Sequence, residues 1–145
     1  IQFCLAGAKR EDTNIAFPEN VRLMGYLKGK ELESFIKNAR LVVIPSRCYE
    51  GFPMAILEAA QFGKPCIGPD HGGFTEIIGK GESAIGRLFE PNNLNDLEKQ
   101  VLTLWNQPVL TEELGRKAYE KLRKEYSSEV VYRKWDELFT KILYG

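Results

Sequence analysis

The chain alternates between short apolar runs typical of β-strands and longer stretches with the 3.6-residue repeat of a helix. The run from Leu41 to Ile44 is continuously apolar, as expected for a strand buried on both faces of a parallel sheet. Glycine and proline residues separate most of these segments. The predicted strands cover residues 2–6, 21–24, 41–44, 65–68 and 85–89, and the predicted helices cover 31–39, 53–62, 74–78, 94–105, 111–126 and 128–143.

This order of elements predicts an α/β fold, a Rossmann-like doubly wound parallel sheet followed by carboxy-terminal helices. Ligands of such sheets bind beyond the carboxyl ends of the strands. Each loop that we consider functional follows a predicted strand: residues 7–10, 25–28, 45–52 and 69–73. The last helix carries an apolar stripe that includes Val131, Trp135 and Leu138, and we expect this stripe to be partly exposed.

Composition restricts the possible functions. The 145 residues suffice for one domain with a core, and the balance of 20 basic and 20 acidic side chains argues against a nucleic-acid partner. No apolar run approaches the length of a transmembrane segment, and no signal peptide opens the chain. Cys4 and Cys66 lie in predicted strands, where we expect small buried side chains, whereas Cys48 lies in a loop. These features indicate a reduced, cytoplasmic protein without a zinc site.

Two carboxylates, Glu50 and Glu58, lie on either side of a predicted junction between a loop and a helix. Pro53 suits the first helical position, because proline lacks the N–H that would have no partner there. Residues 54–62 are apolar on nearly every face, which predicts a buried helix with Glu58 as its only charge. We therefore expect Glu58 to be paired, hydrogen-bonded or facing a ligand. The free amides near Met54 and Ala55 would form an anion site.

The residues around this junction resemble the E-x7-E motif of retaining nucleotide-sugar glycosyltransferases with the GT-B fold, family four, also known as glycosyl transferases group 1. The resemblance covers almost the whole chain. It is carried by Glu50-Gly51-Phe52-Pro53 with Glu58-Ala59-Ala60, by Gly63-Lys64-Pro65, and by Gly72-Gly73-Phe74-x-Glu76.

The resemblance implies a role for each site residue. Glu50, the catalytic candidate, and the amides of Gly51 and Phe52 would hold the hydroxyls of the donor sugar. Glu58 would accept hydrogen bonds from the two ribose hydroxyls, and the amides of Met54 and Ala55 would face the diphosphate. Tyr26, whose backbone would read the base, and Ser46, at the start of the motif loop, complete the donor-binding set.

The resemblance also implies the reaction: transfer of a sugar from a UDP-, GDP- or ADP-linked donor to an acceptor hydroxyl, with retention and without a cofactor or an essential metal. The whole chain, 1–145, would be one carboxy-terminal donor-binding domain. It would be incomplete and inactive alone, because the amino-terminal acceptor domain and the first βα unit are absent. That acceptor domain would be its partner and could attach the cytoplasmic enzyme to the inner membrane. The Gly-x-Gly of many relatives is Gly7-Ala8-Lys9 here, and Lys9 and Arg10 are only weak candidates to replace the basic residues that the family usually has at the diphosphate.

Other interpretations stay open. The chain could be a non-catalytic module that binds nucleotide sugars. Glu50 could form a loop salt bridge, Gly72-Gly73 could be only a turn, and Tyr26 could pack on the surface. His71 is the sole histidine; it could touch a phosphate, but a solvated ring is the simpler expectation. A receiver-like signalling domain is disfavoured because Asp70 has no acidic neighbours in the sequence.

Overall fold

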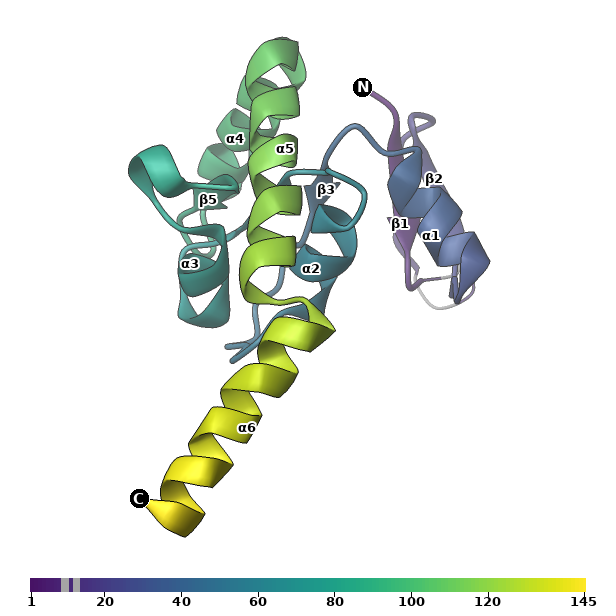
Figure 1. Cartoon of the computed structure of the whole chain (residues 1–145). Coiled ribbons are helices and arrows are strands. Elements are labelled where there is room, and N and C mark those ends of the chain that lie inside the picture. Colours follow the sequence, from purple (N-terminus) through teal and green to yellow (C-terminus); the bar gives the residue numbers. More distant parts are fainter. Residues whose placement is uncertain (9–10, 12–13) are drawn as a thin grey trace. The chain divides into compact units, whose positions relative to one another are not determined.

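The computed structural model describes residues 1–8, 11 and 14–145. It divides the chain into two compact units, Ile1–Phe35 and Ile36–Gly145 (Figure 1). In the first unit, β1 (Phe3–Ala6) pairs in parallel with β2 (Val21–Gly25), and the register shifts between Leu5 and Ala6. Helix α1 (Lys30–Lys37) follows, with acidic residues in its first turn and Lys37 in its last, as the helix dipole favours.

The second unit is built on a three-stranded parallel sheet in the order β3-β4-β5. These strands are β3 (Val42–Val43), β4 (Cys66–Pro69) and β5 (Gly86–Phe89). Helix α2 (Met54–Ala60) connects β3 to β4, while α3 (Gly72–Ile78) and the 3-10 helix η2 (Gly81–Ser83) connect β4 to β5. The core cluster joins the sheet to the later helices through Ile67, Phe89, Val101, Leu104 and Leu114.

Three longer helices complete this unit: α4 (Leu94–Asn106), α5 (Pro108–Glu125) and α6 (Ser128–Tyr144). Side-chain oxygens cap two of them, since Asn93 accepts the amide of Asp96 at 3.0 Å and Ser127 accepts that of Val130 at 3.4 Å. Within the described chain, no helix has the length and apolar composition needed to cross a lipid bilayer.

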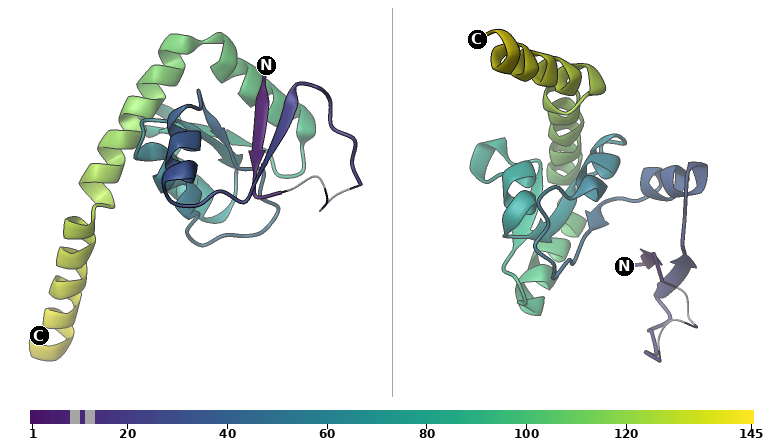
Figure 2. Two further views of the ribbon diagram at one scale, coloured as in Figure 1. Left: turned by 90° about the vertical axis from the view of Figure 1, so that its right-hand side faces the viewer. Right: turned by 90° about the horizontal axis from the view of Figure 1, so that it is seen from below.

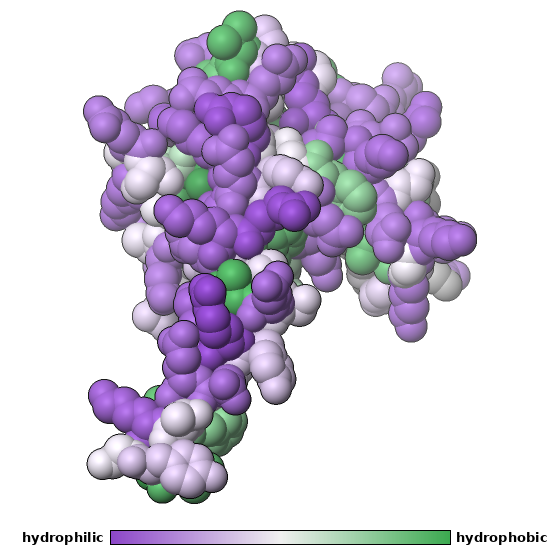
Figure 3. Space-filling model, in the orientation of Figure 1, coloured by the Kyte–Doolittle hydropathy of each residue, from purple (hydrophilic) through white to green (hydrophobic). Residues whose placement is uncertain are grey.

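Helix α6 continues beyond α5, away from the sheet of its unit (Figures 1 and 2). None of its residues is buried, which confirms the expected exposure of its apolar stripe. Trp135 and Phe139 stack on each other with ring centroids 5.6 Å apart. Apolar atoms also gather at the carboxyl end of the helix (Figure 3).

The turn after α2 meets α5 backbone to backbone. A Cβ on Gly115 of α5 would collide with the carbonyl oxygen of Gly63 and lie 3.3 Å from Cδ of Pro65. Glycine at 115 therefore allows the two segments to approach more closely than any side chain would permit.

Two predictions about burial are wrong. The run from Leu41 to Ile44 is only half-buried, because β3 lies at the edge of its sheet. Cys66 is buried as predicted, but Cys4 is exposed, since all four residues of β1 are exposed. The apolar patterns thus located β1 and β3 along the chain without giving how deeply each strand is buried.

Candidate functional site

The loop between β3 and α2 carries most of the predicted site residues. Ser46 organises its start: its hydroxyl accepts the amide of Cys48 at 3.3 Å and lies 3.4 Å from the Cys48 carbonyl oxygen, to which it donates. The side chain of Ser46 is thus used in a local turn. Farther along, the Tyr49 side chain is 80% exposed, whereas Pro53 is fully buried and anchors the end of the loop.

Backbone contacts fasten this loop to the residues that follow β4. The amide of Gly73 donates to the carbonyl oxygen of Glu50 at 2.8 Å. A Cβ on Gly73 would collide with the carbonyl oxygen of Gly51, and one on Gly72 would lie 2.8 Å from that of Glu50. Gly72 also has a φ of 51°, which favours glycine. The Gly72-Gly73 pair is therefore more than a turn: it begins α3 and holds the Glu50 loop at the carboxyl edge of the sheet.

Gly51 differs from these two glycines. No heavy atom lies within 4 Å of a Cβ built on Gly51, so no crowding by the described protein requires glycine there. The next residue, Phe52, contacts Tyr126 with ring centroids 5.7 Å apart. Burial, and after it the charges of Glu125 and Glu76, raises the pKa of Tyr126. The loop is thus supported on both sides of Gly51, while the space at Gly51 stays open.

Helix α2 follows with Pro53 as its N-cap residue. Its buried face consists of Ile56, Ala59 and Ala60, and the opposite face carries Met54, which is 57% exposed, and Glu58. The prediction of a helix buried all round is therefore wrong, and Glu58 is an exposed carboxylate. Met54 and Glu58 lie one turn apart on the same exposed side, because residues at i and i+4 share a face.

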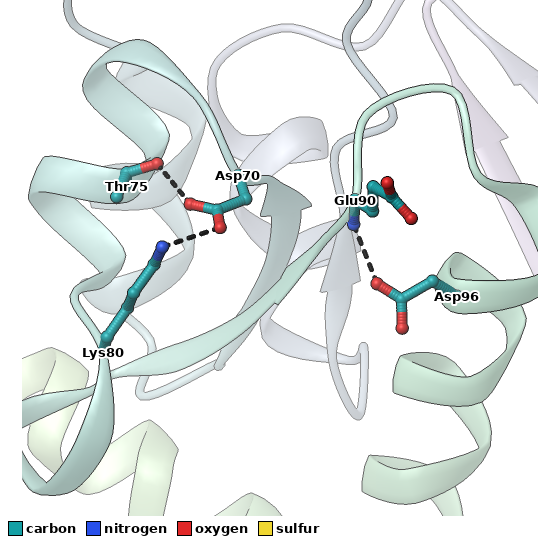
Figure 4. A network of polar contacts seen from close by, with 5 residues as sticks. All are labelled: Asp70, Thr75, Lys80, Glu90 and Asp96. Atoms are coloured by element: carbon teal, nitrogen blue, oxygen red, sulfur yellow. Dashed lines mark hydrogen bonds and ion pairs between the residues drawn. The ribbon is translucent and has the colours of Figure 1, made fainter.

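A polar cluster supports the segment between β4 and α3 (Figure 4). The carboxylate of Asp70 accepts hydrogen bonds from Thr75 at 2.8 Å and from Lys80 at 2.7 Å. The Lys80 bond is the main cause of a lowered Asp70 pKa, and the Thr75 bond acts in the same direction. Because the Asp70 amide also donates to Phe89, at 2.8 Å, this residue ties the loop to two strands and a helix.

A second carboxylate, Asp96, organises the end of β5 (Figure 4). It accepts the amide of Glu90 at 2.8 Å and a side-chain hydrogen bond from Gln100 at 2.9 Å, and these two bonds lower its pKa. Sequence reasoning missed both carboxylate clusters. For Asp96 a signal was available, because Asn93 three residues earlier is a typical helix cap.

His71 lies at the N-cap position of α3. Its ring stacks on Tyr49 with centroids 5.6 Å apart at 15°, and meets Phe74 edge-on at 6.0 Å. Its Nδ1 atom is buried and has no hydrogen-bond partner among the described residues. The ring is therefore half-buried, and the expectation of a solvated ring is wrong for its Nδ1 side.

The second unit brings most of the predicted site residues together: Ser46, Glu50, Gly51, Phe52, Met54, Ala55 and Glu58 belong to one loop and the helix it starts. Tyr26 belongs to the first unit, where its side chain is 65% exposed. Lys9 and Arg10 lie outside the described residues. No ion pair of Glu50 is found in the part of the chain that the structure describes, so the loop salt bridge is not observed.

Residues 1–121 match the family described as glycosyl transferases group 1. The poly(ribitol-phosphate) alpha-N-acetylglucosaminyltransferase of Staphylococcus aureus is 36% identical over 132 residues, which cover 89% of this chain and 25% of that protein. The chain also matches a crystal structure of an S. aureus TarM mutant in complex with fondaparinux, alpha-GlcNAc-glycerol and UDP. The TM-score is 0.71 and the identity 34%, over 83% of this chain and 24% of the other.

The crystal structure of Anabaena HepE in complex with UDP has the same fold, with a TM-score of 0.75 and 20% identity over 84% of this chain and 32% of that one. These matches confirm the predicted α/β fold class with parallel strands. The chain spans about a third or less of the length of each of these three proteins.

Proposed function

Because this chain belongs to the glycosyl transferases group 1 family, as its motifs predicted, we propose that it is the donor-binding half of a retaining glycosyltransferase. The parent enzyme transfers a sugar from a nucleoside diphosphate to an acceptor hydroxyl. The observation that carries the proposal is the exposed side of α2, where Met54 and Glu58 are free to meet a ligand beside the Glu50 loop.

Glu58 suits the ribose of the donor. An ionised carboxylate accepts hydrogen bonds strongly, and two adjacent hydroxyls can donate to its two oxygens. The first amides of α2, at Met54 and Ala55, lack partners within the helix and point toward its amino end. We assign them to the diphosphate, whose negative charge grows as the glycosidic bond breaks.

Glu50 and Gly51 suit the transferred sugar. The Glu50 backbone is fixed by the 2.8 Å hydrogen bond from Gly73, so its side chain starts from a defined point. The open space at Gly51 allows sugar hydroxyls to approach the amides of Gly51 and Phe52. In this assignment Glu50 is the residue nearest the reacting carbon, and Ser46 shapes the loop that carries it.

We assign UDP as the nucleotide, because the TarM mutant and HepE structures both contain it. The acceptor is bound by a further, amino-terminal domain of the parent chain, so residues 1–145 alone transfer no sugar. Tyr26 contacts the base through its backbone. The enzyme acts in the cytoplasm, or at the inner face of the membrane through its other domain, and needs neither a cofactor nor a metal.

Amide chemical shifts in an NMR titration with UDP, GDP and ADP test this proposal. We expect UDP to shift the amides of residues 51–58 and Tyr26, with or without EDTA. Glu58→Gln should weaken binding at least about tenfold, because a charge-assisted hydrogen bond contributes about 1.5–3 kcal/mol. Glu76→Gln removes an exposed glutamate of α3 and serves as the matched control.

The outcomes separate the possible functions. Binding of UDP that Glu58→Gln leaves unchanged would contradict the donor site proposed here. If the full-length parent protein binds UDP at these residues without transferring sugar to any acceptor, the chain belongs to a non-catalytic module. If neither this chain nor its parent binds any of the three nucleotides, the proposal fails.

A further inference from the structure

His71 combines two features that the fold itself does not explain. Its half-buried imidazole stacks on Tyr49 and packs at 89° against Phe74. Yet Nδ1 is buried without a hydrogen-bond partner, alone among the buried side-chain nitrogen and oxygen atoms of residues 1–8, 11 and 14–145. An unpaired buried polar atom in a native protein calls for an explanation.

The two neutral tautomers differ in what they leave unpaired. With the proton on Nδ1, a buried N–H would lack an acceptor, which native structures almost never tolerate. With the proton on Nε2, Nδ1 is an unprotonated nitrogen, and Nε2 is a hydrogen-bond donor. Because Nε2 is not among the buried unpartnered atoms, it is the nitrogen that can reach a group outside the protein. The environment of Nδ1 thus selects the tautomer that donates from Nε2.

Chain connectivity brings this donor to the proposed site. Tyr49, on which the ring stacks, immediately precedes Glu50, and Gly72, which follows His71, packs against the Glu50 carbonyl oxygen. Asp70 is the carboxylate next to His71 in the chain, and its oxygens already accept from Thr75 and Lys80. The structure gives His71 no acceptor of its own in this cluster.

We propose that His71 binds the nucleotide sugar, donating a hydrogen bond from Nε2 to an acceptor oxygen of its diphosphate or its sugar. This inference rests on the proposed donor site and adds a side chain that neither the E-x7-E motif nor the glycine pair includes. The stacking on Tyr49 sets the direction of the donor before the ligand arrives, so little side-chain entropy is lost on binding.

Two substitutions separate the hydrogen bond from the stacking. His71→Phe keeps an aromatic ring against Tyr49 and removes both nitrogens, and because it also removes the unpaired Nδ1 we expect it to fold with an unchanged or higher Tm. His71→Gln places an amide nitrogen near the position of Nε2 and should retain part of the donor function. A third measurement uses the wild-type protein alone. Its ¹⁵N spectrum, recorded without ligand, should show the imidazole proton of His71 on Nε2.

NMR titrations locate the group of the ligand that His71 contacts. The wild type, His71→Phe and His71→Gln are each titrated with uridine, UDP, UDP-glucose and UDP-N-acetylglucosamine. We expect His71→Phe to weaken one class of ligand about three- to tenfold, the loss of one hydrogen bond, and His71→Gln to weaken it less. If His71→Phe binds UDP more weakly than the wild type but binds uridine equally well, His71 contacts the diphosphate. If the variant binds UDP equally well but binds the two UDP-sugars more weakly, His71 contacts the sugar.

Three results would overturn the inference: equal effects of His71→Phe on all four ligands, no effect on any, or a proton on Nδ1 in the wild-type spectrum. If the wild-type protein binds and only the His71 variants behave contrary to expectation, the donor site stands without His71. If neither the wild-type chain nor its full-length parent binds any of the four ligands, both proposals fail together.

Discussion

Substituting Gly73 by alanine tests the contact that holds the Glu50 loop in place. The new Cβ would collide with the carbonyl oxygen of Gly51 and lie 2.8 Å from Cδ of Pro53, so backbone must move. Overpacking of this kind costs about 1–3 kcal/mol, and weakening the 2.8 Å hydrogen bond to Glu50 adds about 1 kcal/mol. Alanine's higher helix propensity offsets about 1 kcal/mol. We expect a net loss of about 1–3 kcal/mol in the free energy of unfolding.

Thermal and urea unfolding followed by circular dichroism measure this loss. For a domain of this size each 1 kcal/mol lowers the Tm by roughly 4 °C, so Gly73→Ala should unfold about 4–12 °C below the wild type. Gly51→Ala is the matched control, because its Cβ would meet no atom within 4 Å. It should change stability by no more than about 0.5 kcal/mol and, in the proposed donor site, weaken the binding of a UDP-sugar more than that of UDP. Equal stabilities of the two variants would refute the fastening of loop to turn.

Three further predictions concern burial and charge. The hydrogen bonds from Lys80 and Thr75 lower the pKa of Asp70, so the stability that its charge contributes is present above the unfolded pKa of about 3.9 and disappears as the pH falls through the folded pKa. Wild type and Asp70→Asn should therefore differ by about 1 kcal/mol or less in urea unfolding at pH 7 and converge as the pH falls below the lowered pKa of Asp70. Burial raises the pKa of the Cys66 thiol to about 12. Ellman's reagent at pH 8 should therefore label the exposed Cys4 and Cys48 in the folded protein, and Cys66 only in urea. Leu104 has 0% exposure, so Leu104→Ala should lower the free energy of unfolding by about 2–5 kcal/mol. Trp135 is 54% exposed, so Trp135→Ala should change it by no more than about 0.5 kcal/mol. Similar losses in the two variants would mean that α6 packs on the rest of the chain.

Local sequence signals predict most element boundaries correctly. Helix α2 starts after Pro53 and ends before Gly63, and each predicted strand is found within two residues of its expected ends. The 3-10 helix at Gly81–Ser83 was not predicted, because one short turn has no apolar repeat to reveal it. Helix α3 begins at Gly72 rather than Phe74, since packing against Glu50 and Gly51, distant in sequence, decides where it starts.

The sequence groups the candidate site residues but does not predict their geometry. The motif residues between Glu50 and Glu58 are adjacent in sequence, so the sequence could group them. It could not say that Glu58 is exposed, because the apolar count of a helix does not tell which face meets the sheet. The support from Gly73 and the stacking of Tyr49 on His71 both join residues more than twenty positions apart, a relation that local patterns do not contain.

The contact between Gly63 and Gly115 has a consequence for redesign of the exposed side of α2. Peptide groups, rather than side-chain volumes, set the spacing between the end of α2 and α5. Changing the size of a core side chain alters how the interior is filled, but leaves this backbone spacing as it is. Residues on the exposed side of α2, such as Met54 and Glu58, which the proposed donor site places at the diphosphate and the ribose, can therefore be exchanged while the helix keeps its place, provided that both glycines stay.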